Sequence, residues 1–275
     1  MRRPFAQVDV FANTALAGNP VAVVLDAAGL DTEAMQRFAN WTNLSETTFV
    51  LPPTSSEADY RVRIFSPSQE MPFAGHPTLG TCHAWLEHGG RPRDSGVVVQ
   101  ECGIGLVRIR RDAGRLALAA PPRLRSGPVA AEVIAKVVTQ LRIDASQVVE
   151  AEWLDNGVPW LGIVMGSVDE VLAVRPGLVD EDVAVIGATA PGSEAAFEVR
   201  AFFEKDGMTA EDPVTGSLSA ALADWLVYSG RVVPPFVVSQ GTALGRAGRV
   251  RVEREGDVLW IGGGTRTMIS GTLSI

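Results

Sequence analysis

An internal repeat constrains the fold of this chain more than any other feature of its sequence. The pattern Tyr-Arg-Val-Arg-Ile-Phe at residues 60–65 returns as Phe-Glu-Val-Arg-Ala-Phe at residues 197–202, 137 positions later. Gly18-Asn-Pro20 and the apolar run after it return as Gly157-Val-Pro159 at an offset of 139. Two further matches stand 140 residues apart: Trp85-Leu86 with Trp225-Leu226, and Val99-Gln100 with Ser239-Gln240. Matches in one order at nearly one offset predict two related halves, with equivalent loops facing each other.

Each half is predicted to alternate short strands with a few helices. Strands are expected at residues 21–25, 47–50, 60–65, 97–100, 106–110 and 115–119, because these runs are apolar or alternating. Helices are expected after Asp31, at 77–88 and at 133–141. Residues 119–128 contain three prolines and a glycine and are therefore predicted to be a linker. The expected domains are residues 1–120 and 129–266.

Composition limits the classes of function. The 275 residues carry 24 Lys and Arg against 32 Asp and Glu, a net charge of −8, without the basic face that nucleic-acid binding needs. No apolar run approaches the ~18 residues of a membrane span, and the N-terminus has no signal-peptide core. The two cysteines are too few for a disulfide framework or a structural zinc site. We expect a cytoplasmic protein without a nucleic-acid or membrane partner.

One loop in each half precedes a helix and has the composition of an anion-binding turn. The first is Phe73-Ala-Gly-His-Pro-Thr78 and the second is Glu211-Asp-Pro-Val-Thr-Gly-Ser217. Backbone N–H groups and the dipole at a helix start favour a carboxylate or phosphate, and Gly75 and Gly216 let a ligand approach the backbone. Each loop taken singly also suits an ordinary turn and helix cap. Their pairing in a duplicated chain favours a binding role.

Glu46 has no counterpart in the second half. It lies in Asn43-Leu-Ser-Glu-Thr-Thr48, next to the apolar residues Phe49 and Val50. Partial burial raises the pKa of a glutamate from its reference value of about 4.3 toward the range useful for proton transfer. The alternative is an exposed glutamate at the start of a strand.

Four motifs resemble those of the PhzF family, the phenazine-biosynthesis isomerase group whose fold is similar to diaminopimelate epimerase. They are GNPVAVVL at residues 18–25, LSET at 44–47, AGHPTLG at 74–80 and EDPVTGS at 211–217, in the family's order over essentially the whole chain. The resemblance implies an α+β fold of two pseudo-symmetric domains, each a strand layer wrapped around a central helix. It also implies an active site in the cleft between the domains, and a last strand, residues 267–275, that returns to the first domain.

The resemblance further implies a chemistry. Members of the family work without a metal or organic cofactor and are commonly homodimers, and the phenazine enzyme moves a proton on a dihydro-hydroxyanthranilate with a glutamate. The family's catalytic positions fall on Glu46, His76 and Asp212, and its substrate-binding positions fall on Gly75, Gly216 and Ser217. The implied function is an isomerase of a small cyclic or unsaturated carboxylic acid, with Glu46 as acid and base.

Two other functions remain open. The first is a family member that binds a metabolite without turnover, because a fold can outlast its chemistry. The second is an epimerase or racemase of a small amino acid that uses His76 in place of a thiol. Two-cysteine racemases of this fold carry one cysteine in each loop, whereas these loops offer His76 and Ser217.

The remaining candidate residues have structural interpretations. Cys82 and Cys102 are expected to be small packing residues, and His76 and His83 lack a third metal ligand nearby. Residues 262–264, three glycines, are expected to form a bend before the last strand. Four tryptophans could line a pocket but are expected in the core: Trp41, Trp153, Trp160 and Trp260.

Overall fold

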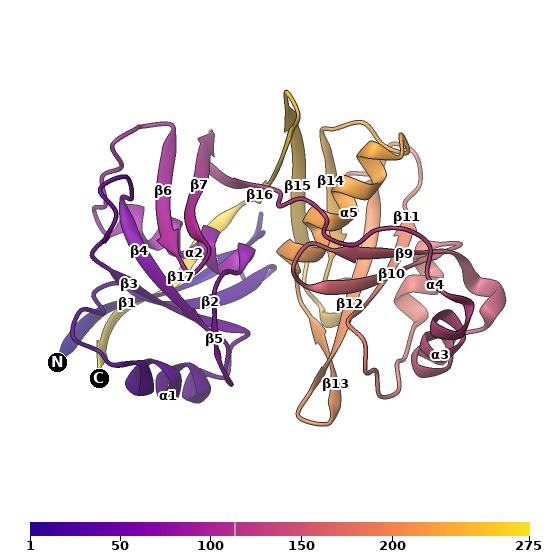
Figure 1. Cartoon of the computed structure of the whole chain (residues 1–275), viewed down its shortest axis with the longest axis horizontal. Helices are drawn as coiled ribbons and strands as arrows, with labels where there is room; N and C mark the ends of the chain where they lie inside the picture. Colours follow the sequence, from indigo (N-terminus) through magenta and orange to yellow (C-terminus); the bar gives the residue numbers. More distant parts are fainter. Residues whose placement is uncertain (113) are drawn as a thin grey trace. The chain divides into compact units, whose positions relative to one another are not determined.

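The structure is a computed structural model that describes residues 1–112 and 114–275. It divides into two compact units. Unit 1 comprises Met1–Ala119 and Gly262–Ile275, and unit 2 comprises Ala120–Ile261. Figure 1 colours the chain from indigo to yellow, so the yellow C-terminal strand is found beside the indigo first strand within unit 1.

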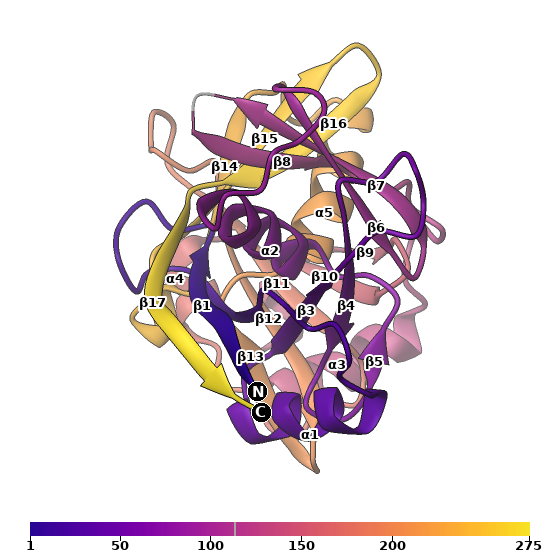
Figure 2. The ribbon, with the colours of Figure 1, turned by 90° about the vertical axis from the view of Figure 1, so that its left-hand side faces the viewer.

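Unit 1 is a strand layer around helix α2 (Gly75–Glu87). Antiparallel pairs join β17 (Thr265–Ser274), β1 (Arg2–Val10) and β2 (Asn19–Val24), and β2 lies parallel to β3 (Glu46–Leu51). β3 pairs with β4 (Tyr60–Phe65), which also contacts β5 (Glu70–Met71) and the parallel β6 (Val97–Cys102). β7 (Gly105–Asp112) and β8 (Arg115–Ala119) follow as antiparallel neighbours. Strands β1, β2, β3, β6, β8 and β17 all contact α2, which lies among them in Figure 2.

Unit 2 has helix α5 (Gly216–Tyr228), which contacts β9 (Val148–Asp155) and β15 (Gly248–Glu255). β9 is antiparallel to β10 (Pro159–Met165), which is parallel to β11 (Val183–Ala188). β12 (Phe197–Lys205) pairs with β11, with β13 (Met208–Asp212) and with the parallel β14 (Phe236–Gln240), and β14 pairs with β15. The remaining elements of unit 2 are α3 (Ala131–Leu141), η1 (Ala145–Gln147), α4 (Val168–Ala173) and η2 (Thr242–Leu244), and β16 (Val258–Gly263) begins in unit 2 and ends in unit 1.

The two units repeat the same succession of strand pairings. The parallel pair β2–β3 corresponds to β10–β11, the antiparallel pair β3–β4 to β11–β12, and the parallel pair β4–β6 to β12–β14. A side-chain motif repeats with them. Arg63 on β4 lies over the ring of Phe65 and binds both carboxylate oxygens of Glu70, as Arg200 on β12 does with Phe202 and Glu211.

Local sequence explains how Glu46 comes to begin β3. Helix α1 (Thr32–Thr42) begins after Asp31, whose side chain accepts the N–H of Ala34 as a cap. The helix ends at Asn43, which takes the left-handed conformation (φ 53°) that turns the chain back toward the sheet. β3 therefore starts three residues later, at Glu46, next to Val21 on β2.

A glycine lets α2 lie close to the sheet. A Cβ on Gly80 would lie 2.3 Å from Cγ1 of Val21, so only glycine permits this approach without a shift. Leu79, Cys82 and Ala84 of the same helix are buried. The first turn of α2, with Gly75 and His76, is thereby held against β2.

Each unit has its own apolar cluster. In unit 1, Met35, Phe38, Phe49 and Phe65 pack together with Val24. In unit 2, side chains from α3, α4 and the β9–β12 strands form the second cluster, which includes Val137, Leu141, Trp153, Leu161, Val171, Val185 and Phe202. Among the described residues, no helix combines the length and the apolar composition that a bilayer crossing requires.

Two sequence interpretations were wrong. Trp41 is 78% exposed, because it lies three residues beyond Phe38 at the rim of the apolar face of α1 and stacks on that ring at 6.1 Å. Trp153 and Trp160 are buried as expected. Gly262 and Gly263 lie within β16 rather than in a bend. The glycine at position 262 is explained by packing, because a Cβ there would lie too close to the backbone oxygen of Leu116.

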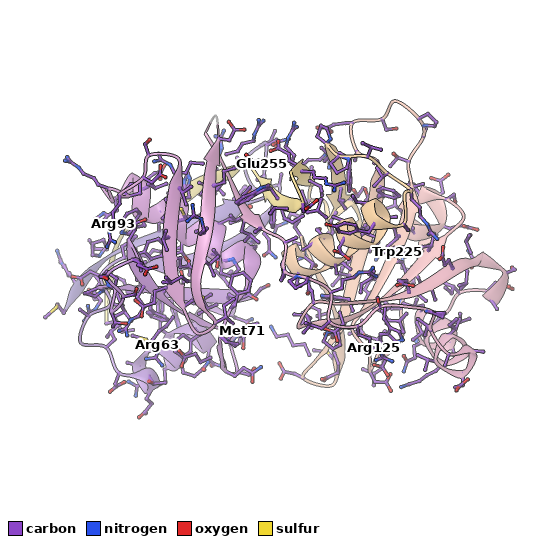
Figure 3. All side chains as sticks on the ribbon, turned by 45° about the horizontal axis from the view of Figure 1, so that its top comes forward. Arg63, Met71, Arg93, Arg125, Trp225 and Glu255 are labelled. Carbon is purple, nitrogen blue, oxygen red and sulfur yellow. The ribbon has the colours of Figure 1, made fainter. Side chains whose placement is uncertain are left out.

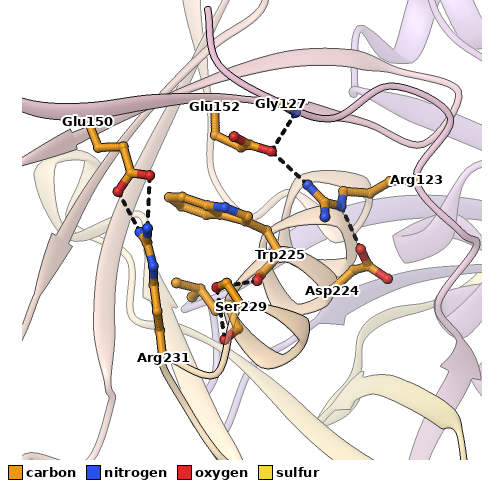
Figure 4. A network of polar contacts seen from close by, with 9 residues as sticks. Arg123, Gly127, Glu150, Glu152, Asp224, Trp225, Ser229 and Arg231 are labelled. Carbon is orange, nitrogen blue, oxygen red and sulfur yellow. Dashed lines mark hydrogen bonds and ion pairs between the residues drawn. The ribbon is translucent and has the colours of Figure 1, made fainter.

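The segment predicted to be a linker is bound to unit 2. Nε of Arg123 donates to Asp224 on α5 at 2.5 Å, and Nη1 donates to Glu152 on β9 at 3.0 Å. Glu152 also accepts the backbone N–H of Gly127. Figure 4 shows Trp225 between this group and the Arg231–Glu150 ion pair. The prolines exclude regular structure, but the arginine ties the segment to two elements.

Candidate functional site

Glu46 and His76 form a close pair in unit 1. Oε2 of Glu46, at the start of β3, lies 3.3 Å from Nε2 of His76 in the first turn of α2. The side chains are 15% and 7% exposed. The alternative of an exposed glutamate at a strand start is therefore wrong. Thirty residues separate the two in sequence, and the packing of α2 on β2 and β3 brings them together.

His76 is a neutral imidazole in this environment. Burial lowers its pKa to about 3, although a hydrogen bond from the ring to the backbone carbonyl of Pro20 acts in the opposite direction. Since Nε2 makes no hydrogen bond among the described residues, Nδ1 is the nitrogen that donates to Pro20. Nε2 then presents a lone pair to the carboxyl group of Glu46. This contact is attractive when one proton lies between Nε2 and Oε2.

The helix that begins at each predicted binding loop lacks a side-chain cap. α2 begins at Gly75 after Ala74, whose methyl group cannot accept a hydrogen bond. α5 begins at Gly216 after Thr215, whose hydroxyl bonds Asp212 and Gln240 and makes no cap contact. The capping interpretation of the two loops is thus not supported at either helix. The dipole at each helix start favours an anion there.

Asp212 is the last residue of β13 and is held by the loop that follows it. Oγ1 of Thr215 donates to Oδ2 of Asp212 at 2.7 Å, and Nε2 of Gln240 donates to the backbone oxygen of Asp212 at 2.9 Å. The repeat gives Asp212 an apolar counterpart, because Glu70-Met71-Pro72 in unit 1 matches Glu211-Asp212-Pro213. Met71 is labelled in Figure 3, near Arg63 of the repeated ion pair.

Ser217, in the first turn of α5, is held by a residue of β10 and by a residue of the turn before it. The indole N–H of Trp160 donates to its Oγ at 3.1 Å, and the side-chain amide of Asn156 donates to its backbone oxygen at 2.8 Å. Because Oγ accepts from the indole, its own hydrogen is directed to another acceptor. The sequence favoured a core position for Trp160 and did not predict its hydrogen bond to Ser217. Its position just after Gly157-Val-Pro159, a repeated motif, was the available signal.

The predicted site residues therefore fall into two groups. Unit 1 brings together Glu46, His76 and Gly75, and unit 2 brings together Asp212, Gly216 and Ser217. The groups differ in chemistry, because the residue that begins β11 where Glu46 begins β3 is Val183, which is buried. Among the described residues, the glutamate–histidine contact thus lies in the first of the two repeats.

The cysteines are not poised for catalysis. Burial raises the pKa of Cys82 to about 12 and raises that of Cys102 as well, so both thiols stay protonated near pH 7. Cys102 lines a separate cavity of about 490 Å³ in unit 1 with Arg61, Arg63 and Glu101, away from the Glu46–His76 pair. Within the part of the chain that the structure describes, no three His, Cys, Asp or Glu residues gather as metal ligands would.

The sequence is similar to a known family over nearly its full length. A model of the family described as phenazine biosynthesis-like protein, PhzC-PhzF, matches residues 8–272. The relative named "Antisense-enhancing sequence 1" of Schizosaccharomyces pombe is 36% identical over 97% of each chain. Trans-2,3-dihydro-3-hydroxyanthranilate isomerase of Pseudomonas fluorescens is 32% identical over 96% of this chain and 94% of the relative.

Solved structures share the fold. A phenazine biosynthesis protein of the PhzF family from Bacillus anthracis superposes with a TM-score of 0.85 at 23% identity, covering 100% of both chains. A hydroxyproline epimerase from Agrobacterium vitis superposes with a TM-score of 0.61 at 13% identity, covering 99% of this chain and 92% of the epimerase. The predicted α+β fold, shared by PhzF proteins and epimerases, is confirmed.

Proposed function

Because the chain belongs to the PhzF family, which includes relatives named as isomerases, we propose that it moves a proton on a small cyclic or unsaturated carboxylic acid without a cofactor. The observation that carries the proposal is the contact between Glu46 and His76 in a largely buried setting. In its acid form the carboxyl group of Glu46 can donate a hydrogen bond to the neutral imidazole, and in its carboxylate form it can take a proton from the substrate.

Glu46 is the proton carrier in this proposal. Its carboxylate takes a proton from a carbon next to the unsaturated system, and the electron pair of that C–H bond moves into the ring as the double bonds shift. The resulting carboxylic acid returns the proton to another carbon, so atoms and electrons balance and the double bond has migrated. His76 stays neutral because burial lowers its pKa to about 3, and its lone pair accepts a hydrogen bond from Glu46 in the acid form.

The remaining predicted residues bind and orient the substrate. The hydroxyl of Ser217, which accepts from Trp160, is set to donate to a substrate carboxylate, and the amides of Gly75 and Gly216 at the helix starts suit the same charge. Asp212 suits an amino or hydroxyl group of the substrate. Trans-2,3-dihydro-3-hydroxyanthranilate, the substrate named for several relatives, carries all three groups and is the first compound to test.

Deuterium incorporation from solvent tests the proposal. Wild type, incubated in D₂O with this compound and a panel of small unsaturated carboxylic acids, is expected to place deuterium at the carbon that receives the proton. Glu46→Gln is expected to lower the rate at least about a hundredfold, as general acid–base catalysis contributes 10²–10⁴-fold. Glu87→Gln is the matched control, because Glu87 also lies 3.3 Å from a histidine of α2, His83, but is 55% exposed.

Other outcomes would select other functions. Exchange that survives Glu46→Gln removes Glu46 as the carrier. A ligand that raises the melting temperature but never exchanges would favour a binding protein without turnover. Inversion at one carbon without a migrated double bond would favour an epimerase, the class to which one structural neighbour belongs.

A further inference from the structure

Gln240 is a fully buried polar side chain at the end of β14, and it bonds the loop that carries Asp212. Its Nε2 donates to the backbone oxygen of Asp212 and to Oγ1 of Thr215, both at 2.9 Å. Its Oε1 accepts the backbone N–H of Thr215 at 2.9 Å. An amide nitrogen has two hydrogens, so these contacts use both. The side chain spans the loop from its first residue to its fourth.

These contacts set the direction of every hydrogen in the group. The amide nitrogen of Gln240 only donates, so Oγ1 of Thr215 must accept from it. The hydroxyl of Thr215 has one hydrogen, which is therefore directed to Oδ2 of Asp212, 2.7 Å away. The order Gln240, Thr215, Asp212 thus holds the carboxyl group of Asp212 as a fixed hydrogen-bond acceptor.

The loop also packs tightly against the end of β14, which carries Gln240, and against the start of the neighbouring strand β15. A Cβ on Gly241 would lie 2.7 Å from the backbone oxygen of Pro213, and Gly241 has φ +94°, a conformation that favours glycine. A Cβ on Gly248 would lie 2.3 Å from Cγ2 of Val214. The close packing thus leaves no room for a side chain at position 241 or at position 248, on either side of the contact between Gln240 and the loop. Its hydrogen bonds act on a segment that has little room to move.

The equivalent glutamine of unit 1 makes different contacts. Gln100, also fully buried and 140 residues earlier, accepts from the hydroxyl of Tyr60 at 2.9 Å and donates to Oγ1 of Thr78 within α2 at 3.0 Å. The residue that matches Tyr60 in unit 2 is Phe197, which has no hydroxyl to offer. Gln240 bonds Asp212 and Thr215 before the start of α5, whereas Gln100 bonds Tyr60 on β4 and Thr78, which lies within α2. The two glutamines occupy equivalent positions in the repeats, but their hydrogen-bond partners differ.

We propose that Gln240 is a positioning residue, which acts through Thr215 to present Asp212 as an oriented acceptor for an amino or hydroxyl group of the substrate. This inference rests on the proposed function, in which Asp212 touches the substrate. This role of Asp212 narrows the substrate class. The substrate must carry a hydrogen-bond donor, preferably a cationic one, for Asp212, in addition to the carboxylate that Ser217 and the helix N-termini bind.

Two variants test the positioning role, and one controls for burial. Thr215→Val removes the hydroxyl that bonds Asp212 and costs no helix cap, since Thr215 makes none. Gln240→Met removes the amide at similar volume, and Gln100→Met makes the same change in unit 1. With trans-2,3-dihydro-3-hydroxyanthranilate, Thr215→Val and Gln240→Met are expected to raise KM about tenfold with kcat within about twofold. Gln100→Met is expected to leave both constants within about twofold of wild type.

A double variant and an exchange measurement sharpen the test. Because Gln240 bonds Oγ1 of Thr215, which in turn bonds Asp212, the two substitutions are coupled, and the double variant Gln240→Met/Thr215→Val is expected to raise KM by less than the product of the two single effects. The backbone N–H of Thr215, which donates to Gln240, is expected to exchange with D₂O faster in Gln240→Met and not in Gln100→Met. This readout needs no substrate.

Asp212→Asn separates the failure of this inference from the failure of the proposed function. If Asp212→Asn raises KM while Gln240→Met and Thr215→Val behave like Gln100→Met, Gln240 is not a positioning residue and the proposed function stands. If Asp212→Asn changes nothing, the substrate contact assigned to Asp212 is wrong. If wild type neither binds nor turns over the compound, the proposed substrate class fails, and unchanged exchange at Thr215 would overturn the structural half of the inference independently.

Discussion

At the scale of single residues, the chemistry of the site depends on burial more than on residue type. The chain has three histidines, and they meet three environments. His76 is buried, donates to Pro20 and has its pKa lowered to about 3. His83 is partly buried, bonds Thr265 through Nδ1 and has a lowered pKa for the same reason. His88 is exposed at the end of α2. Only His76 has a carboxyl group and almost no solvent beside it.

The buried His76 predicts a pH dependence of stability. Its pKa is about 3 in the folded chain and about 6.5 when unfolded, so between these values the unfolded chain binds a proton that the folded chain does not. The contribution of His76 to the free energy of unfolding is therefore fully present above about pH 6.5. It is lost as the pH falls toward 3, by up to about 1.4 kcal/mol for each pH unit.

Urea unfolding at a series of pH values measures this slope. His76→Gln is expected to flatten it between pH 6.5 and 4, whatever the variant's stability at pH 7. His88→Gln is the control and should keep the wild-type slope. A His76→Gln slope equal to that of wild type would mean that another group causes the acid sensitivity.

At the scale of elements, the repeated arginine ties strands to helices in both units, with different burial. Arg200 donates to Glu211 on β13 and to the carbonyls of Val171 and Val174 at the end of α4. Arg63 donates to Glu70 on β5 and to the hydroxyl of Thr32 at the start of α1. The Arg200–Glu211 side chains are 5% and 12% exposed, against 25% and 40% for Arg63–Glu70. The same motif thus has a core role in one unit and a surface role in the other.

Methionine substitutions of the two arginines should have unequal costs. Arg200→Met leaves Glu211 largely buried without its partner and frees the carbonyls of α4, so a loss of about 3–5 kcal/mol is expected. Arg63→Met breaks a pair that water screens, so a loss of no more than about 1 kcal/mol is expected. Chemical denaturation measures both values. Equal losses would show that burial does not distinguish the two ion pairs.

At the scale of the whole molecule, the last strand contributes to the first core. β17 pairs with β1 along nearly its whole length, and Leu273 and Ile275 pack against the cluster that holds Phe38 and Phe49. Residues from the two ends of the chain therefore share one unit. The second cluster is assembled from residues within Ala120–Ile261 and uses nothing from either terminus. Homodimer formation, which the family resemblance implies, stays a prediction.

The separate cores predict separable stability. Leu273→Ala is expected to cost about 1–2 kcal/mol, less than a fully buried leucine, because the side chain is only partly buried. Ile143→Ala is the counterpart, since Ile143 packs in the same way against the cluster of unit 2.

Hydrogen exchange read by mass spectrometry locates each effect. Leu273→Ala should speed exchange in peptides of β1, β2 and β3, while peptides of β9 to β12 stay as in wild type. Ile143→Ala should give the reverse pattern. Faster exchange throughout the chain in either variant would mean that the two units unfold as one.

Many of the helices and strands could be predicted because they depend on patterns of residues that are close together in the sequence. The strand expected at 60–65 is β4, the helix expected after Asp31 is α1 with the expected cap, and the helix expected at 133–141 is α3, which starts at Ala131. Period and capping depend on residues close in sequence. The exposure of Trp41 was missed because neither period nor composition says where an apolar face ends.

The sequence by itself predicted that the chain repeats and that Glu46 occurs in one repeat alone, and its resemblance to a known family implied that each repeat is a strand layer around a helix. Only the tertiary structure decided that Glu46 meets His76, that His76 is neutral, and that Gln240 bonds Asp212 and Thr215 while Gln100 bonds Tyr60 and Thr78. The reason is that a pKa and the direction of a hydrogen bond depend on desolvation and on partners distant in sequence. The chain acquires this desolvation and these partners only when it folds.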